Sequence, residues 1–126
     1  MIKKVLFGAL VFFYLVAGMN HFIMPEFYYP LIPDYLPNKV VINTISGVIE
    51  ILLACGLLIP NTRKWSALGI ILLLLAFIPA HVHFILIGGC VDASLCVPDW
   101  VAWVRLLVIH PVLIYWAWYF KNYKWN

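Results

Sequence analysis

The amino-acid sequence predicts an all-α membrane protein, a bundle of four transmembrane helices that forms a single domain over residues 1–126. Of its 126 residues, 66% are hydrophobic and only 10% are charged, and the mean hydropathy is +1.02. Soluble domains contain about 45–50% apolar and about 25% charged residues, so a small soluble protein could not bury this much apolar surface. The lipid bilayer is therefore the expected environment and partner of the chain.

Four apolar runs are each long enough to cross a bilayer, which requires about 20 helical residues. We expect the helices at about residues 5–23, 40–59, 65–87 and 100–120. The long connection that follows the first helix is rich in prolines and aromatic residues. It is expected either to form a lid over the bundle, with a short helix that begins at Pro25, or to act as a linker with aromatic anchors.

The basic residues predict how the bundle is oriented. Six of them fall at the ends that a cytoplasmic N-terminus places inside: Lys3, Lys4, Arg63, Lys64, Lys121 and Lys124. Lys39 is the only cation in the two long connections, and an excess of Lys and Arg marks the cytoplasmic side. We therefore predict a multi-pass protein of the cell membrane with both termini cytoplasmic and with loops 24–39 and 88–99 extracytoplasmic. The net charge of +3 is small and scattered, so nucleic acid is not an expected partner.

The ionisable residues of the expected helices gather in the outer half of the bundle. The candidate ligand-binding residues are His21, Glu50, His81, His83 and Arg105, and His110 lies near the middle of the last helix. A charged group at the membrane centre costs about 3 kcal/mol, so such groups face the bundle interior or a water-filled cavity and are usually paired. This distribution predicts a polar pocket that opens toward the outer leaflet.

Glu50 and Arg105 are the only carboxylate and the only cation within the expected helices. Opposite charges at similar depth predict a direct or bridged contact between them. Three interpretations stay open: the pair anchors a ligand, it only fixes the register of two helices, or Arg105 extends to the outer headgroups.

Two prolines affect the orientation and the hydrogen bonding of the histidines in the last two helices. His81 and His83 lie about 200° apart on an ideal helix, so only one of them is expected to face the pocket. Pro79 removes one backbone hydrogen bond and predicts a kink there. His110 precedes Pro111, which frees a carbonyl in the same helix, and its imidazole is expected to satisfy a loosened backbone carbonyl.

Metal binding and catalysis have weak support in the sequence. The H-x-H spacing at residues 81–83 is poor evidence for a metal site, and neither HxxxH nor ExxH occurs. We therefore predict no metal ion. No pattern identifies a catalytic group, so whether the chain is an enzyme stays open.

The cysteines differ in their surroundings. Cys90 and Cys96 flank five residues in the second long connection, on the side where disulfides persist. They predict a structural disulfide that joins the third and fourth helices, and the alternative is a redox-active dithiol that exchanges electrons with a quinone. Cys55 is interpreted as a small core residue.

Several motifs resemble those of one family. In chain order they are Asn20-His21-Phe22 with Pro25 and Tyr28, Ile32-Pro33-Asp34-Tyr35-Leu36-Pro37, Ser46-Gly47-Val48-Ile49-Glu50, Gly56-Leu57-Leu58-Ile59-Pro60, Pro79-Ala80-His81, Val101-Ala102-Trp103-Val104-Arg105 and Leu113-Ile114-Tyr115-Trp116-Ala117-Trp118. Their order and spacing resemble the DoxX-like family of small four-helix integral membrane proteins over nearly the whole chain. His110-Pro111 departs from the Leu-Gln-like pair expected there.

The resemblance implies a four-helix bundle and points to His21, Glu50, His81 and Arg105. Members of that group include small subunits of a thiosulfate:quinone oxidoreductase and proteins linked to amine-dehydrogenase maturation, and distant animal relatives are assembly chaperones. The first hypothesis is a redox-associated subunit or accessory factor with a pocket for a quinone- or lipid-like ligand, quinone being the candidate cofactor. The second is a non-enzymatic assembly or chaperone protein whose polar cluster is structural, and the third is a small proton or metal transporter. A membrane protein or a second copy of the chain is the expected protein partner.

Overall fold

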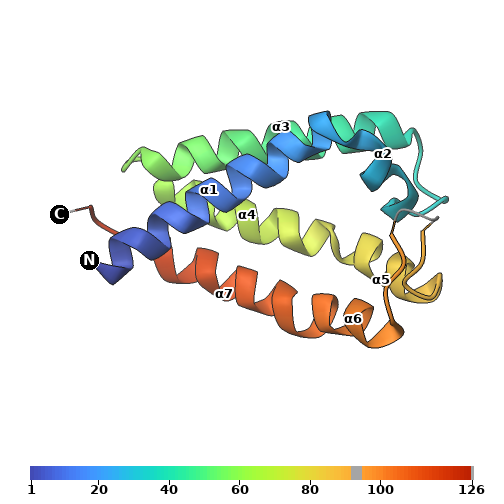
Figure 1. The fold of residues 1–126 in the computed structure, drawn as a ribbon. Coiled ribbons are helices and arrows are strands. Elements are labelled where there is room, and N and C mark those ends of the chain that lie inside the picture. Colours follow the sequence, from blue (N-terminus) through green and yellow to red (C-terminus); the bar gives the residue numbers. More distant parts are fainter. Residues whose placement is uncertain (92–94, 126) are drawn as a thin grey trace.

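Long apolar segments fold as helices in an apolar solvent because a helix satisfies its own backbone hydrogen bonds. The computed structural model describes residues 1–91 and 95–125, and its helices lie side by side in one bundle (Figure 1). Four of its helical segments are long and apolar enough to cross a membrane: Ile2–Ile23, Lys39–Leu58, Arg63–Leu86 and Asp99–Phe120. The described residues contain no strand, so the all-α fold class and the four spans are confirmed.

Proline residues divide the spans into shorter elements. In chain order these are α1 (Ile2–Ile23), α2 (Pro25–Tyr28), the 3-10 turn η1 (Tyr29–Leu31), α3 (Lys39–Leu58), α4 (Arg63–Ala76), α5 (Ile78–Leu86), α6 (Asp99–Val104), the π-helical turn η2 (Arg105–Ile109) and α7 (His110–Phe120). Both termini lie at one end of the bundle, which we call the terminal end. The connections α1–α3 and α5–α6 lie at the other, the loop end (Figure 1).

The third and fourth spans are each interrupted near a proline. α4 ends one residue before Phe77, whose N–H is shared between the carbonyls of Leu73 and Leu74 at 3.0 and 3.2 Å. Pro79 follows at the start of α5 and lacks the N–H that would continue the helix, so the predicted disruption of this span near Pro79 is confirmed. In the fourth span, Pro111 likewise lies at the start of a helix, α7, and cannot donate a backbone hydrogen bond. The π-helical turn η2 immediately before α7 accommodates this missing hydrogen bond.

The helices α1 and α3 cross at Gly18 and Gly47. A Cβ atom added at Gly18 would lie 2.9 Å from the carbonyl oxygen of Gly47, and one added at Gly47 would lie 2.7 Å from the Cβ atom of His21. Neither neighbour is the end of a flexible side chain, so only glycine allows this approach. Small residues at such a crossing let two backbones pack closely where no hydrophobic effect drives association.

The terminal end holds the main apolar core and a buried cation. The core residues include Phe7, Leu10, Ala54, Leu57, Ala67, Ile70, Ala117 and Phe120. The Arg63 side chain is 4% exposed. Its Nε donates to the carbonyl of Leu57 at 2.7 Å, its Nη2 to that of Leu58 at 3.3 Å, and its Nη1 to that of Tyr123 at 2.5 Å. Arg105 is therefore not the only cation inside the bundle, and Arg63 joins the end of α3 to the C-terminal segment.

Because α1 and α3 cross at two glycines, adding one methyl group at the crossing is expected to lower the stability of the protein strongly. Gly47→Ala should lower the free energy of unfolding by about 1–3 kcal/mol, because backbone atoms must move to admit the Cβ atom. Thermal unfolding in lipid nanodiscs, followed by circular dichroism, measures this loss. Gly8→Ala in α1 is the matched control, since a Cβ atom there meets nothing within 4 Å. Equal stability of the two variants would contradict the close crossing.

Arg63 predicts a second effect on stability. Arg63→Gln should detach residues 121–125 and lower the free energy of unfolding by about 3 kcal/mol, because it removes charge-assisted hydrogen bonds to three carbonyls. Limited proteolysis of the C-terminal segment reports the detachment. Lys64→Gln changes the exposed neighbour and should leave the digestion pattern as it is. Identical digestion of both variants would refute this role of Arg63.

Candidate ligand pocket

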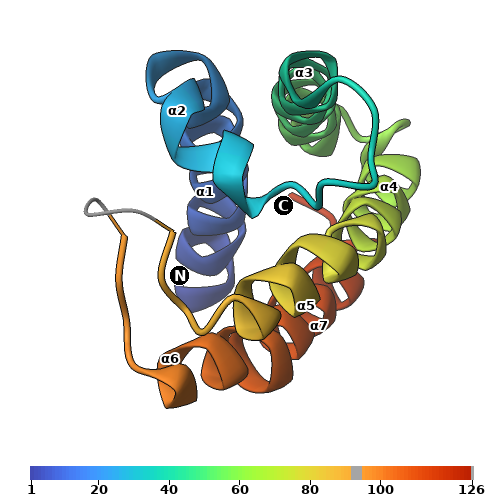
Figure 2. The same cartoon turned by 90° about the vertical axis from the view of Figure 1, so that its right-hand side faces the viewer.

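A cavity of about 440 Å³ lies in the loop-end half of the bundle. Seen from the loop end, α1 and α3 stand on one side and α5 and α6 on the other (Figure 2). Side chains of α1 and α3 form the first wall of the cavity, and side chains of α5, η2 and α7 form the second. Most of the lining is apolar, and the polar groups gather on these two walls.

The segment after α1 closes the loop end of this cavity. Leu31, Ile32 and Pro33 line the cavity and are buried. α2 begins at Pro25. The predicted short helix at Pro25 is thus confirmed, and the lid stays a prediction that the position of this segment favours. At its far end the Lys39 ammonium donates to the Asp34 carboxylate at 2.7 Å and thereby lowers the pKa of this exposed carboxyl.

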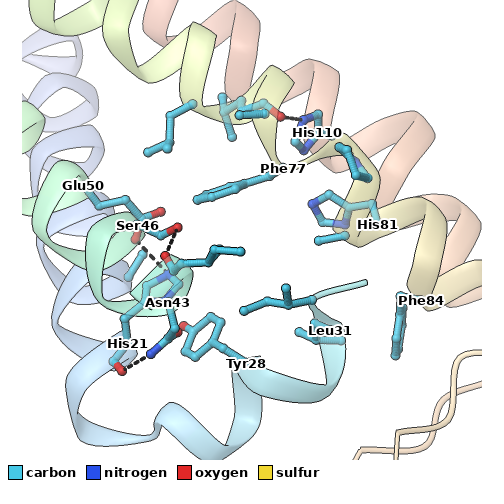
Figure 3. Close-up of a pocket in the computed structure, with 18 of the residues that line it drawn as sticks. His21, Tyr28, Leu31, Asn43, Ser46, Glu50, Phe77, His81, Phe84 and His110 are labelled. Atoms are coloured by element: carbon cyan, nitrogen blue, oxygen red, sulfur yellow. Dashed lines mark hydrogen bonds and ion pairs between the residues drawn. The ribbon is translucent and has the colours of Figure 1, made fainter. Parts of the chain in front are cut away.

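On the first wall, His21 and Asn43 form two hydrogen bonds with each other. The Asn43 Nδ2 donates to the His21 carbonyl at 2.9 Å, and the Asn43 Oδ1 lies 2.6 Å from the His21 Nδ1. Because the amide donates through its nitrogen, its oxygen accepts, and the His21 Nδ1 must carry a hydrogen. Both side chains are buried between α1 and α3 (Figure 3).

Glu50 pairs with His21 rather than with Arg105. The His21 Nε2 lies 3.3 Å from the Glu50 Oε2, and the Glu50 side chain is 6% exposed. No ion pair within 4 Å joins Glu50 to Arg105, both of which lie in the described part of the chain, so the predicted direct contact is wrong. The two residues line the same cavity from opposite walls, and a bridged contact stays a prediction.

The second wall carries His81, His110 and Arg105. The His81 and His110 rings meet edge to face with centroids 4.8 Å apart. The His110 Nε2 lies 2.6 Å from the Leu74 carbonyl and therefore donates to it. His110 thus satisfies a backbone carbonyl, but the prediction that this carbonyl is the one freed by Pro111 in the same helix is wrong, because Leu74 lies in the last turn of α4. The Arg105 guanidinium lies 4.8 Å from the centre of the Phe84 ring.

His81 and His83 diverge as the helical spacing predicts. His81 lines the cavity, whereas His83 does not and is partly exposed. Four of the five predicted ligand-binding residues therefore lie at the cavity. His83 lies outside its lining because a rotation of about 200° separates it from His81.

Two buried polar atoms of the first wall lack a well-formed hydrogen bond: the Tyr14 hydroxyl, and the Glu50 Oε2, whose only neighbour of this kind is the His21 Nε2 at 3.3 Å. Tyr14 is 1% exposed and lines the cavity, as Glu50 does. Sequence reasoning did not select Tyr14 as a ligand residue. Its position four residues before Gly18 was the available signal.

Tyr28 completes the first wall near the lid. Its ring stacks on the His21 ring with centroids 3.8 Å apart, and its hydroxyl accepts a hydrogen bond of 2.9 Å from the Asn20 side chain. Burial raises the pKa of Tyr28 above its ordinary value, so its hydroxyl stays neutral at physiological pH.

The disulfide between Cys90 and Cys96 is present, as predicted. Cys55 is exposed on α3, so its interpretation as a core residue is wrong. Among residues 1–91 and 95–125, no group of three or more His, Cys, Asp or Glu side chains is arranged to hold a metal ion.

Comparison with known proteins identifies the family of the chain. No curated protein and no solved structure matches it. Residues 10–121 match a family that is described as a domain of unknown function (DUF8561). This match includes most of α1 and all of the later helices, and with them both walls of the cavity. The chain therefore belongs to the DUF8561 family.

Proposed function

We propose that this chain is an integral membrane protein that binds a quinone- or lipid-like molecule at its loop-end cavity and serves redox chemistry as a subunit or accessory factor. The cavity of about 440 Å³ carries the proposal, because its lining is apolar except for polar groups on two facing walls. Its volume lies within the range of about 300–1,000 Å³ that small-molecule sites occupy.

A quinone headgroup suits this distribution of polar groups. It is a flat ring with oxygen atoms at opposite ends, and each wall offers groups that bind oxygen. The first wall offers the Tyr14 hydroxyl as a donor, and the second offers His81 and Arg105. The Phe77 side chain extends into the space between the walls, where a planar ring can pack against it (Figure 3). The resemblance to DoxX-like proteins supports the same choice.

Unsatisfied polar atoms favour a ligand over a purely structural cluster. A cluster that only fixes the fold is expected to satisfy its buried polar groups internally. Here the Tyr14 hydroxyl is buried without a hydrogen bond, and the Glu50 Oε2 has only the 3.3 Å contact of its ion pair with His21. An assembly or chaperone protein with a structural cluster is therefore the weaker proposal, and the ligand experiment below separates the two.

The proposed orientation places the terminal end in the cytoplasm of a cell-membrane protein. Basic residues gather there: Arg63 contacts the C-terminal segment, and the Lys4 ammonium lies 5.8 Å from the centre of the Trp125 ring. The lid and the Cys90–Cys96 disulfide then lie outside, where disulfides persist.

Ligand binding is tested with decylubiquinone, in oxidised and reduced form, added to the protein in nanodiscs. We expect saturable binding of at least one form. His81→Ala should weaken it about tenfold, because one hydrogen bond to an oxygen of the headgroup is lost. Equilibrium dialysis of the purified protein measures the dissociation constant.

His83→Ala is the matched control, because this histidine lies two residues away and outside the cavity lining. It should bind like the unmodified protein. Absence of saturable binding of both forms would remove the proposed function. Equal weakening by both histidine variants would place the ligand elsewhere on the bundle.

The orientation is tested by labelling single added cysteines in intact cells with a membrane-impermeant maleimide. Glu26 and Asn61 are both exposed and lie at opposite ends of the bundle. We expect Glu26→Cys to be labelled and Asn61→Cys to be labelled only after the cells are opened. The reverse pattern would invert the proposed topology. The protein with only its native cysteines gives the background from Cys55.

A further inference from the structure

Tyr14 and Glu50 of the first wall lie on neighbouring parts of the α1–α3 crossing. Tyr14 is one helical turn before Gly18, and a Cβ atom at Gly18 would lie 3.0 Å from the Cβ atom of Glu50. Tyr14 is 1% exposed and Glu50 is 4% exposed, and both residues line the cavity. The Tyr14 hydroxyl has no hydrogen bond, and the Glu50 Oε2 has only its 3.3 Å contact with the His21 Nε2, so both residues keep hydrogen-bonding capacity.

Glu50 presents an acceptor to the cavity in either protonation arrangement of its pair with His21. The His21 Nδ1 carries a hydrogen that points at Asn43, so the Nε2 is either the second donor of an imidazolium or the acceptor of a neutral ring. In the first case Glu50 is a carboxylate. In the second, a carboxyl proton on Oε2 is directed to the Nε2, 3.3 Å away. Both arrangements leave lone pairs of Oε2 without a donor.

Tyr14 supplies the complementary group. Its hydroxyl can donate one hydrogen bond and has no partner among the described residues. A ligand hydroxyl would satisfy both atoms at once, because it can accept from Tyr14 and donate to Glu50. A ligand carbonyl would satisfy only Tyr14, since its oxygen accepts and would leave the Glu50 Oε2 facing another acceptor.

We infer that the first wall recognises a hydroxyl group on an apolar ligand, so that the cavity binds the quinol in preference to the quinone. This inference rests on the proposed function. Glu50 sets the preference, because only its acceptor distinguishes a hydroxyl from a carbonyl. Tyr14 binds both forms, because each of them offers an oxygen that accepts.

The ligand-side experiment compares three compounds by anaerobic equilibrium dialysis with the protein in nanodiscs. These are decylubiquinol, decylubiquinone and the dimethyl ether of the quinol, which keeps the ring but has no hydroxyl to donate. We expect the quinol to bind about tenfold more tightly than either of the others, as the loss of one hydrogen bond to a buried acceptor predicts.

Two variants assign the preference to its residues. Glu50→Gln should lower the ratio of quinol to quinone affinity about tenfold, because the amide can turn its donor toward a carbonyl. Tyr14→Phe should weaken both forms by similar factors and leave the ratio unchanged. Tyr115→Phe is the matched control, since Tyr115 is exposed on α7 and outside the cavity lining, and it should change neither.

The outcomes separate this inference from the function on which it rests. Equal affinity of the unmodified protein for quinol, quinone and the dimethyl ether would overturn the hydroxyl preference while the ligand pocket stands. Binding of none of the three compounds would remove both. The comparison of compounds needs no variant, so a Glu50→Gln protein that fails to fold leaves the inference open to refutation.

Discussion

The close crossing of α1 and α3 is the constraint on which the rest of the structure depends. Gly18 and Gly47 bring the two backbones so near that either added Cβ atom would lie within 2.9 Å of the facing helix. Only at this distance does the Asn43 amide reach both the carbonyl and the ring of His21. The crossing therefore builds a rigid polar wall, and the helices opposite it need not supply partners for that wall.

The second wall is shaped by interrupted helices, whereas the first is shaped by close helix packing. The break between α4 and α5 leaves the carbonyl of Leu74 available, and His110 donates to it from the neighbouring span. That bond connects two interrupted spans and sets the His110 ring beside His81. One close-packed helix pair and one interrupted pair thus face each other across the cavity.

Sequence reasoning placed the spans and the depth of the polar residues, because bilayer thickness and the helical rise determine both. It could not predict that Glu50 would pair with His21, since pairing depends on how each helix is rotated and tilted. Depth alone made Arg105 an equally suitable partner. The burial of Arg63 was missed for a related reason. It depends on residues 121–125 folding back across the bundle, for which charge counting has no signal.

The lid and the charge of the first wall bear on how a ligand reaches the cavity. Leu31, Ile32 and Pro33 cover the loop end, so a ligand that enters there must displace buried apolar side chains. Phe13 and Ile109 line the cavity from α1 and η2 and are also exposed on the side of the bundle that we place in lipid. An uncharged, lipid-soluble ligand suits a mostly apolar cavity in which the Glu50 carboxyl already has the His21 ring as its partner.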